Sequence, residues 1–475
     1  MKRRRPCPIA VRCLLCALSL LLQACGESGT EPWHRAEFAA EFTADSTDVE
    51  SFEAYRSLED DVFAELTEEV YAKVDTGPGF EFARFSAGSA ADPRSRAPDW
   101  NRSFELASSA PASGVLLLHG LTDSPYSLRA IGQALHAAGH QVLGLRLPGH
   151  GTAPSALLDL RPEDMAAAVR LAASYLSSQV GGGPLHIVGY STGATLAVDY
   201  ALDALGGKIS PVPTSLVLIS PAVGVSPAAA LAVWKRRAGR VPGLGRLAWL
   251  QIQPEFDPYK YNSFATNGAD LVHRLTRRVA NRVAVRAKSN PDEVLPPTLV
   301  FKSTVDATVS TDAVVDQLLG RLAPSRHQLV LFDINREAVT SDLLVADPGH
   351  LTVRLLEEMP LPFGLALVTN ESSRSRAVVL RRTPALGVEA TSTPLGLAWP
   401  RGVISLSHVA LPFPPDDPLY GAEPPATGEG LFLGQMAVKG ERGLLRIPAD
   451  WLMRLRHNPF YELLEQRTLE WVAPR

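Results

Sequence analysis

The stretch Gly189-Tyr190-Ser191-Thr192-Gly193 decides the fold of this 475-residue chain. It follows an apolar run typical of a strand, residues 185–188, and precedes a run typical of a helix, residues 194–202. A serine at the tip of so sharp a turn has a strained backbone, and glycines two residues to each side let strand and helix approach closely. The pattern therefore predicts a serine whose Oγ is exposed above a sheet.

Alternating strand-like and helix-like runs surround this turn. The apolar runs typical of strands are residues 115–118, 142–145, 185–188, 215–220 and 298–302. Runs with helical spacing, residues 126–138 and 163–180, lie between the first three of them. Near-continuous apolar strands that alternate with helices indicate a mostly parallel sheet covered on both faces. We therefore expect an α/β fold over residues 101–475.

Two long segments interrupt this alternation. Residues 221–296 contain no clear strand and carry several aromatic side chains, so we expect a lid over a site at the carboxyl ends of the strands. Residues 335–400 are expected to be an insertion that contains β-structure. The later strand-like pieces are residues 328–332, 365–368, 377–380 and 402–406, and a last helix is expected at residues 449–472.

The first hundred residues have a different character. Four basic residues, 2–5, precede an apolar stretch that is too short to span a bilayer, so residues 1–24 are typical of an export signal. Residues 25–50 are mostly polar and small, and we interpret them as a tether. Residues 51–100 are expected to form a helix and a loop. The helix is expected at residues 51–74, and short strands are expected at residues 80–85 and 103–107.

The export signal ends in Leu22-Gln23-Ala24-Cys25, which is similar to the lipobox of bacterial lipoproteins. This resemblance implies that Cys25 is lipidated and begins the mature chain, with an ordinary cleaved signal as the alternative. The other three cysteines precede the proposed cut, so the mature chain would contain no disulfide and no thiol metal site. We therefore expect a lipid-anchored protein of the bacterial cell envelope, at the outer rather than the inner membrane, which faces the periplasm or the surface.

The proposed cut also changes the charge of the chain. It removes five basic residues and no acidic ones, which leaves 41 basic against 50 acidic residues and a net charge of −9. An acidic surface argues against nucleic acid as a partner. No later stretch of the sequence is apolar and long enough for a transmembrane helix, so attachment to a membrane would come from acyl chains.

Three motifs, taken in order, resemble the α/β-hydrolase family and in particular its bacterial esterase, monoacylglycerol-lipase-like and serine-aminopeptidase-like branch. They are His119-Gly120-Leu121-Thr122-Asp123-Ser124, Leu147-Pro148-Gly149-His150-Gly151 and the turn at Ser191. The resemblance covers most of the chain after about residue 100. It implies an α/β-hydrolase fold, a nucleophilic serine followed in the sequence by an acid and then a histidine, and neither a metal nor a cofactor.

Ser191 needs a base within hydrogen-bond reach and a third group that orients this base. The resemblance implies that the acid lies just past the strand that follows the lid, and Asp306 occupies that position. Asp312 and Asp333 are the competing carboxylates. Asp312 would begin a helix, where an acid more often interacts with the helix N-terminus.

Two histidines compete for the role of the base. His408 is favoured because it follows the strand expected at residues 402–406, whereas no clear strand leads to His350. The separation of 102 residues between Asp306 and His408 exceeds the family's usual spacing and implies an insertion before the histidine. The resemblance also implies that the backbone N–H groups of Leu121 and Thr192 form an oxyanion hole. The side chains of His119 and His150 are expected to brace their loops.

These residues together predict a serine hydrolase that cleaves carboxylic esters, of an acyl or lipid-derived class, through Ser191, His408 and Asp306. A serine peptidase or amidase with the same three residues is one alternative. A non-catalytic envelope lipoprotein that keeps the fold for binding is another. The oligomeric state does not follow from the sequence.

Overall fold

The computed structural model describes residues 30–224, 245–306, 308–324, 326–338, 349–357, 360–426, 430–434 and 455–473. The expected export signal, the expected lipidation site Cys25 and part of the expected lid, residues 225–244, lie outside these ranges.

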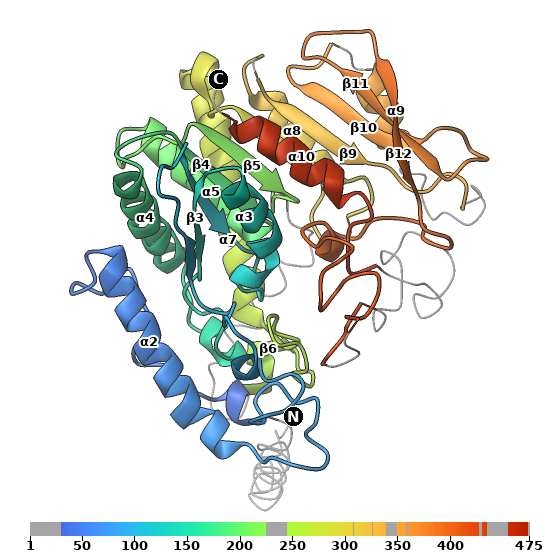
Figure 1. Cartoon of the computed structure of the whole chain (residues 1–475). Coiled ribbons are helices and arrows are strands. Elements are labelled where there is room, and N and C mark those ends of the chain that lie inside the picture. Colours follow the sequence, from blue (N-terminus) through green and yellow to red (C-terminus); the bar gives the residue numbers. More distant parts are fainter. Residues whose placement is uncertain are drawn as a thin grey trace, which may run out of the picture.

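A ten-stranded sheet runs through the protein in the order β1-β3-β2-β4-β5-β8-β9-β10-β11-β12 (Figure 1). The strands are β1 Phe104–Leu106, β2 Gly114–Leu118, β3 Gln141–Leu145, β4 Leu185–Tyr190, β5 Ser215–Ile219, β8 Thr298–Ser303, β9 Gln328–Phe332, β10 Gly364–Asn370, β11 Ala377–Thr383 and β12 Thr391–Ala398. Pairing is parallel from β3 to β10 and antiparallel at the edges, where β1, β11 and β12 lie. The predicted α/β fold with a mostly parallel sheet is confirmed.

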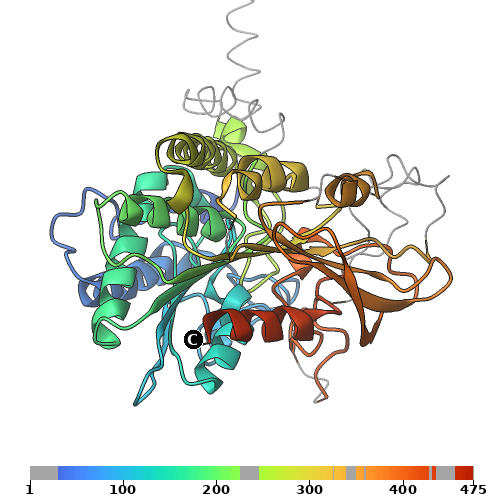
Figure 2. The same cartoon turned by 90° about the horizontal axis from the view of Figure 1, so that it is seen from above.

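Helices cover both faces of the sheet. The longer ones are α2 Phe52–Glu69, α3 Arg129–Ala137, α4 Pro162–Gln179, α5 Thr192–Leu205, α7 Thr266–Ser289, α8 Thr311–Gln317, α9 Gly349–Glu357 and α10 Tyr461–Val472. Neighbouring residues of a strand point to opposite faces, so Leu116 and Leu118 pack with α4, α5 and α7, whereas Val115 and Leu117 pack with α3 and α10. Figure 2 shows α7 and the red helix α10 on opposite sides of the sheet. The two cores explain why the central strands are apolar throughout.

The insertion extends the sheet and returns to the point where it began. After β9 the chain leaves at Asn335, contributes α9 and β10–β12, and comes back beside the same residue. The backbone N–H of Asn335 donates to the carbonyl of Ile404 at 2.7 Å, and its Nδ2 donates to that of Val403 at 2.9 Å. Its Oδ1 accepts from Nδ2 of Asn370 on β10 at 3.0 Å. The fully buried Asn335 therefore joins the two ends of the insertion.

Three expectations about local structure are wrong. Residues 402–406 form no strand, because they bond to the loop after β9 instead of to a neighbouring strand. Residues 80–85 form no strand but a series of turns. Each turn is closed by a hydrogen bond from a backbone N–H to the carbonyl three residues earlier, such as that from Phe80 to Gly77. Residues 455–460 of the expected last helix are not helical, and the helix α10 begins at Tyr461, whereas residues 449–454 lie outside the described ranges.

The expected tether over residues 25–50 is also wrong for its described part. Trp33, Phe42 and Val49 are buried, and the Phe42 ring lies 5.1 Å from that of Tyr55 on α2. Buried Arg146 donates to both carboxylate oxygens of Glu41, at 3.0 and 3.1 Å. Scattered apolar side chains and one carboxylate thus hold a mostly polar segment against the domain.

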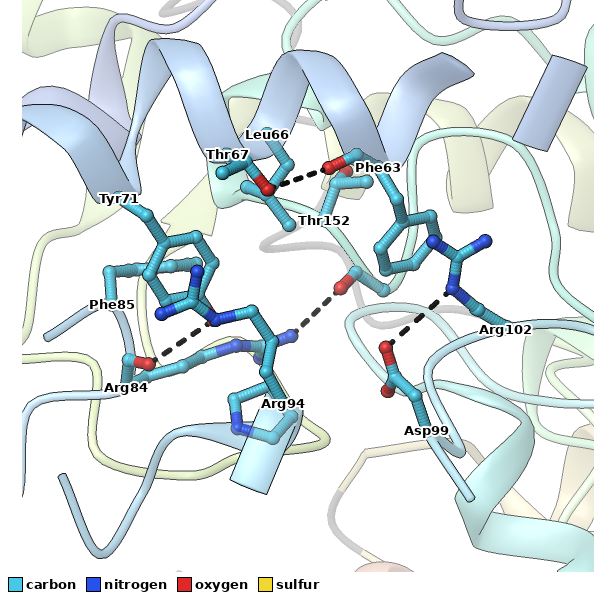
Figure 3. A pocket seen from close by; sticks show the side chains of 12 residues that line it. Phe63, Leu66, Thr67, Tyr71, Arg84, Phe85, Arg94, Asp99, Arg102 and Thr152 are labelled. Carbon is cyan, nitrogen blue, oxygen red and sulfur yellow. Dashed lines mark hydrogen bonds and ion pairs between the residues drawn. The ribbon is translucent and has the colours of Figure 1, made fainter. Parts of the chain in front are cut away.

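The N-terminal helix is fixed to the loops around residues 84–102 at a small pocket of about 90 Å³ (Figure 3). There the guanidinium carbon of Arg94 lies 3.3 Å from the ring centroid of Tyr71. The buried Arg84 donates to the carbonyl of Gly151 at 3.0 Å. The pocket therefore connects α2 to the loop that contains the His150-Gly151 motif.

Replacing Asn335 by alanine is expected to lower the free energy of unfolding by about 2–3 kcal/mol, because the carbonyl of Val403 and the amide of Asn370 lose a buried partner. Urea unfolding followed by circular dichroism measures the change. Asn281→Ala, at an exposed position of α7, is the matched control and should stay within about 0.5 kcal/mol of the parent. An equal loss of unfolding free energy in the two variants would contradict the proposal that Asn335 joins the two ends of the insertion.

Candidate active site

The turn at Ser191 has the strained geometry that its sequence predicts. Ser191 lies between β4 and α5 with φ 53° and ψ −115°, which is a positive φ for a residue with a side chain. A Cβ at position 193 would lie 2.0 Å from the carbonyl oxygen of Leu118, and one at position 189 would lie 2.5 Å from Cα of Ala194. Both positions therefore require glycine.

The imidazole of His408 lies between Ser191 and Asp306. Its Nε2 is 3.1 Å from Oγ of Ser191, and its Nδ1 is 2.7 Å from Oδ2 of Asp306. His408 is buried and begins the short helix η10 His408–Ala410. His350, the competing histidine, is exposed in the first turn of α9. The structure thus brings together Ser191, His408 and Asp306.

The carboxylate of Asp306 is fully buried and surrounded by donors. Its Oδ1 accepts the backbone N–H groups of Thr308 at 2.8 Å and Val309 at 2.9 Å. Its Oδ2 accepts from His408 and from the ammonium of Lys302. Burial alone would raise the pKa of Asp306, but the charges of His408 and Lys302 and their hydrogen bonds hold this pKa far below its usual range. Asp306 is therefore ionised at any physiological pH.

The competing carboxylates have other partners. Asp312 is exposed in the first turn of α8 and pairs with Arg354 at 3.3 Å. Asp333 accepts from Arg336 at 2.9 Å and from Oγ1 of Thr369 at 2.9 Å. The hydrogen bonds to His408 distinguish Asp306 from both.

The side chain of His119 braces the loop before Leu121. Its Nε2 accepts the backbone N–H of Leu147 at 3.0 Å, so its proton resides on Nδ1, which donates to the carbonyl of Gly120 at 2.9 Å. Burial lowers the pKa of His119 well below its usual value and keeps the ring neutral. The side chain therefore braces its own loop, as predicted, and also joins this loop to the one that contains Leu147.

Leu121 and Thr192 border the same pocket as Ser191. Thr192 is the first residue of α5, so its N–H belongs to the first turn of the helix, where backbone donors have no partner within the helix. This arrangement places both residues of the expected oxyanion hole beside the serine.

The pocket above Ser191 has a volume of about 240 Å³ and mostly apolar walls. Its apolar lining consists of Leu121, Ala222, Phe264, Ala269, Val272, Val309 and Val409. Phe264, Ala269 and Val272 belong to the segment expected to form a lid. The described part of that segment also contains β6 Trp249–Gln251, β7 Phe264–Ala265 and the long helix α7.

Sequence reasoning missed three charged residues of the site. Lys260 donates to Asp123 at 2.9 Å where both line the pocket, and Lys302 contacts Asp306. The pairing of Lys260 with Asp123 joins residues 137 positions apart and leaves no local signal. A lysine in the otherwise apolar run 298–302 is a signal that was available.

Within the described ranges, no group of three or more His, Cys, Asp or Glu side chains is placed to hold a metal ion. The same part of the chain contains no helix of the length and hydropathy that crossing a membrane requires.

Comparison with known proteins gives matches of three kinds. The Alpha/beta hydrolase family matches residues 115–364, just over half of the chain. A thermostable monoacylglycerol lipase from Bacillus sp. (strain H-257) is 28% identical over 197 residues, which cover 41% of this chain and 71% of that protein. The solved structure of a Paleococcus ferrophilus monoacylglycerol lipase has 18% identity and a TM-score of 0.38, over 49% of this chain and 88% of that one. A second solved structure, from work on the metagenome-derived lipolytic enzymes LipS and LipT, has 20% identity and a TM-score of 0.39. This match covers 49% of this chain and 87% of the other.

Replacing Gly193 by alanine is expected to destabilise the protein by at least about 4 kcal/mol, because the new methyl group would overlap the Leu118 carbonyl. Thermal and urea unfolding measure the loss. The control is Gly364→Ala, whose Cβ would have its nearest neighbours at 3.7 Å and should cost less than about 1 kcal/mol. A Gly193→Ala variant as stable as this control would disprove the close approach of α5 to β2.

Proposed function

The chain belongs to the α/β-hydrolase family, and from this premise we propose that it is a serine hydrolase that cleaves carboxylic esters. The observation that carries the proposal is the continuous hydrogen-bonded chain from Oγ of Ser191 through the imidazole of His408 to Asp306. A serine hydroxyl is a weak nucleophile on its own and needs such a base.

In the proposed reaction, Oγ of Ser191 attacks the ester carbonyl while Nε2 of His408 takes its proton. The imidazolium then gives this proton to the leaving alcohol, and an acyl group remains on Ser191. Water attacks the acyl group with the help of the same imidazole, which releases the acid and restores the serine. Asp306 keeps the proton of His408 on Nδ1 and stabilises the imidazolium.

The negative oxygen that forms on the carbonyl would be held by the N–H groups of Leu121 and Thr192. Each donor of this kind is worth on the order of 10²- to 10³-fold in rate. The bracing of the Gly120 loop by His119 supports this role, because a preorganised donor needs no rearrangement during the reaction.

We assign the substrate to the class of acyl or lipid-derived esters. The walls of the pocket are mostly apolar and favour an acyl chain. The name of the Bacillus relative, a monoacylglycerol lipase, agrees with this class. An acyl-chain substrate would also be encountered at a membrane, where the lipid anchor proposed at Cys25 would hold the enzyme within the bacterial envelope.

Ser191→Ala and His408→Ala are expected to lower kcat for a short p-nitrophenyl ester by at least about 10³-fold, because nucleophile and base act together. His350→Ala, the matched histidine control, should keep the parent rate. Hydrolysis of the ester and labelling by a fluorophosphonate probe are the measurements. Faster cleavage of a p-nitroanilide than of the ester would favour an amidase. Folded parent protein that never reacts with the probe would favour a non-catalytic binding protein.

The lipid anchor is tested by replacing Cys25 with alanine. The parent expressed in a bacterial host should incorporate a clickable palmitate analogue and partition into the Triton X-114 detergent phase, because acyl chains supply the membrane affinity. The Cys25→Ala variant should lose both properties, whereas Cys16→Ala, upstream of the proposed cut, should keep them. Incorporation that persists in Cys25→Ala would rule out this site of lipidation.

A further inference from the structure

A lysine is buried against the acid of the site. Lys302 lies on β8 with its side chain fully inaccessible to solvent, four residues before Asp306. Its ammonium contacts Oδ2 of Asp306 and donates to the carbonyl of Val309 at 2.9 Å. The same Oδ2 accepts Nδ1–H of His408 at 2.7 Å. One carboxylate oxygen is therefore shared by a fixed cation and by the imidazole.

Packing alone does not explain a charge at this position. Moving an ammonium out of water costs several kcal/mol, and only a well-placed partner offsets this cost. The preceding positions of the strand, 298–301, carry apolar or hydroxyl side chains and are buried. An apolar side chain at position 302 would be the usual choice for such a buried position. The position of the charge, in contact with Asp306, therefore requires an explanation at the site.

We propose that Lys302 is a positioning residue that acts through Asp306 and sets the acidic limit of the pH range over which Ser191 reacts. This inference rests on the proposed function. Because Lys302 neutralises Asp306, the imidazolium of His408 faces an ion pair instead of a lone carboxylate. A neutralised carboxylate holds the imidazolium less tightly, so the proton taken from Ser191 passes more readily to the leaving alcohol.

Other titratable or charged groups near His408 have partners of their own. Tyr190 lies with its ring 5.3 Å from the imidazole and donates to the carbonyl of His408 at 3.3 Å. Asp123 and Lys260, which pair with each other at 2.9 Å, line the same pocket as His408. Among these groups, Lys302 is the cation in contact with the carboxylate that orients His408.

A structural role for Lys302 is the competing explanation. The bond to Val309 helps to hold the loop that contains Asp306, so loss of the lysine would lower stability or the limiting rate in either case. Only the electrostatic role moves the pH dependence of the reaction. The test must therefore measure a pH profile as well as a rate.

The experiment measures the second-order rate constant of fluorophosphonate labelling from pH 4 to 9 in the parent, Lys302→Met and Lys208→Met. Lys208 is exposed and pairs with Asp203, so its variant removes the same charge far from the site. The acidic limb of Lys302→Met should move to higher pH by at least about one unit, because the carboxylate of Asp306 is then no longer neutralised by the lysine and favours the imidazolium more strongly. The Lys208→Met limb should coincide with that of the parent.

A double-mutant cycle with Asp306→Asn tests whether the effect of Lys302 on the acidic limb passes through Asp306. An effect of Lys302 that is carried by the carboxylate of Asp306 should shrink in that background, whereas direct repulsion between the ammonium and the imidazolium would give the same shift in both backgrounds. Lys302→Gln, which keeps a donor and lacks the charge, replaces the methionine variant if the latter fails to fold.

The possible outcomes distinguish the two proposals. A parent that is labelled and a folded Lys302 variant with an unmoved limb would overturn the inference about Lys302 and leave the proposed function intact. Failure of both Lys302 variants to fold would assign the lysine to stability and also overturn it. A parent that is not labelled at all would overturn the proposed function and this inference with it.

Discussion

The backbone contact between helix α5 and strand β2 is the constraint on which the rest of the site depends. A Cβ on Gly193 would meet the carbonyl oxygens of Leu118 and His119 at 2.0 and 2.5 Å, so the helix lies directly on the end of the strand. This contact forces Ser191 into its positive φ and brings the start of α5 beside the loop that follows His119. The half-buried hydroxyl of Ser191 in the pocket and the two proposed oxyanion donors, on Leu121 and Thr192, therefore share one structural cause.

His408, whose imidazole lies beside Ser191, comes from a distant part of the sequence. The family match ends at residue 364, within β10, and His408 lies beyond it. The three added strands lengthen the sheet at its edge, and Asn335 ties their far end back to the loop after β9. A large separation in the sequence thus becomes a short distance in space, since the insertion begins and ends at the same place.

Short sequence patterns were sufficient to predict most of the fold. The central strands are buried on both faces, so their apolar runs predicted them directly, and the glycine pattern around Ser191 predicted the turn. His408 was chosen because a strand was expected before it, and no such strand exists. The histidine is nevertheless at the site because residues 403–404 bond to Asn335.

Other features depend on contacts that sequence periodicity does not encode. The buried segment around Phe42 is mostly polar and is held by Arg146, more than a hundred positions away. The Asp123–Lys260 pair also joins two residues that are 137 positions apart and meet only in the folded protein. Lys302 differs from these, because a charge within an apolar strand is visible in the sequence and its meaning becomes clear only beside Asp306.

A crystal structure of the protein after reaction with a fluorophosphonate tests the central claim most directly. The account predicts a phosphorus atom bonded to Oγ of Ser191, a phosphoryl oxygen within hydrogen-bond distance of the backbone nitrogens of Leu121 and Thr192, and Nε2 of His408 beside the bonded oxygen. An adduct on another residue, or a phosphoryl oxygen that contacts neither nitrogen, would contradict it.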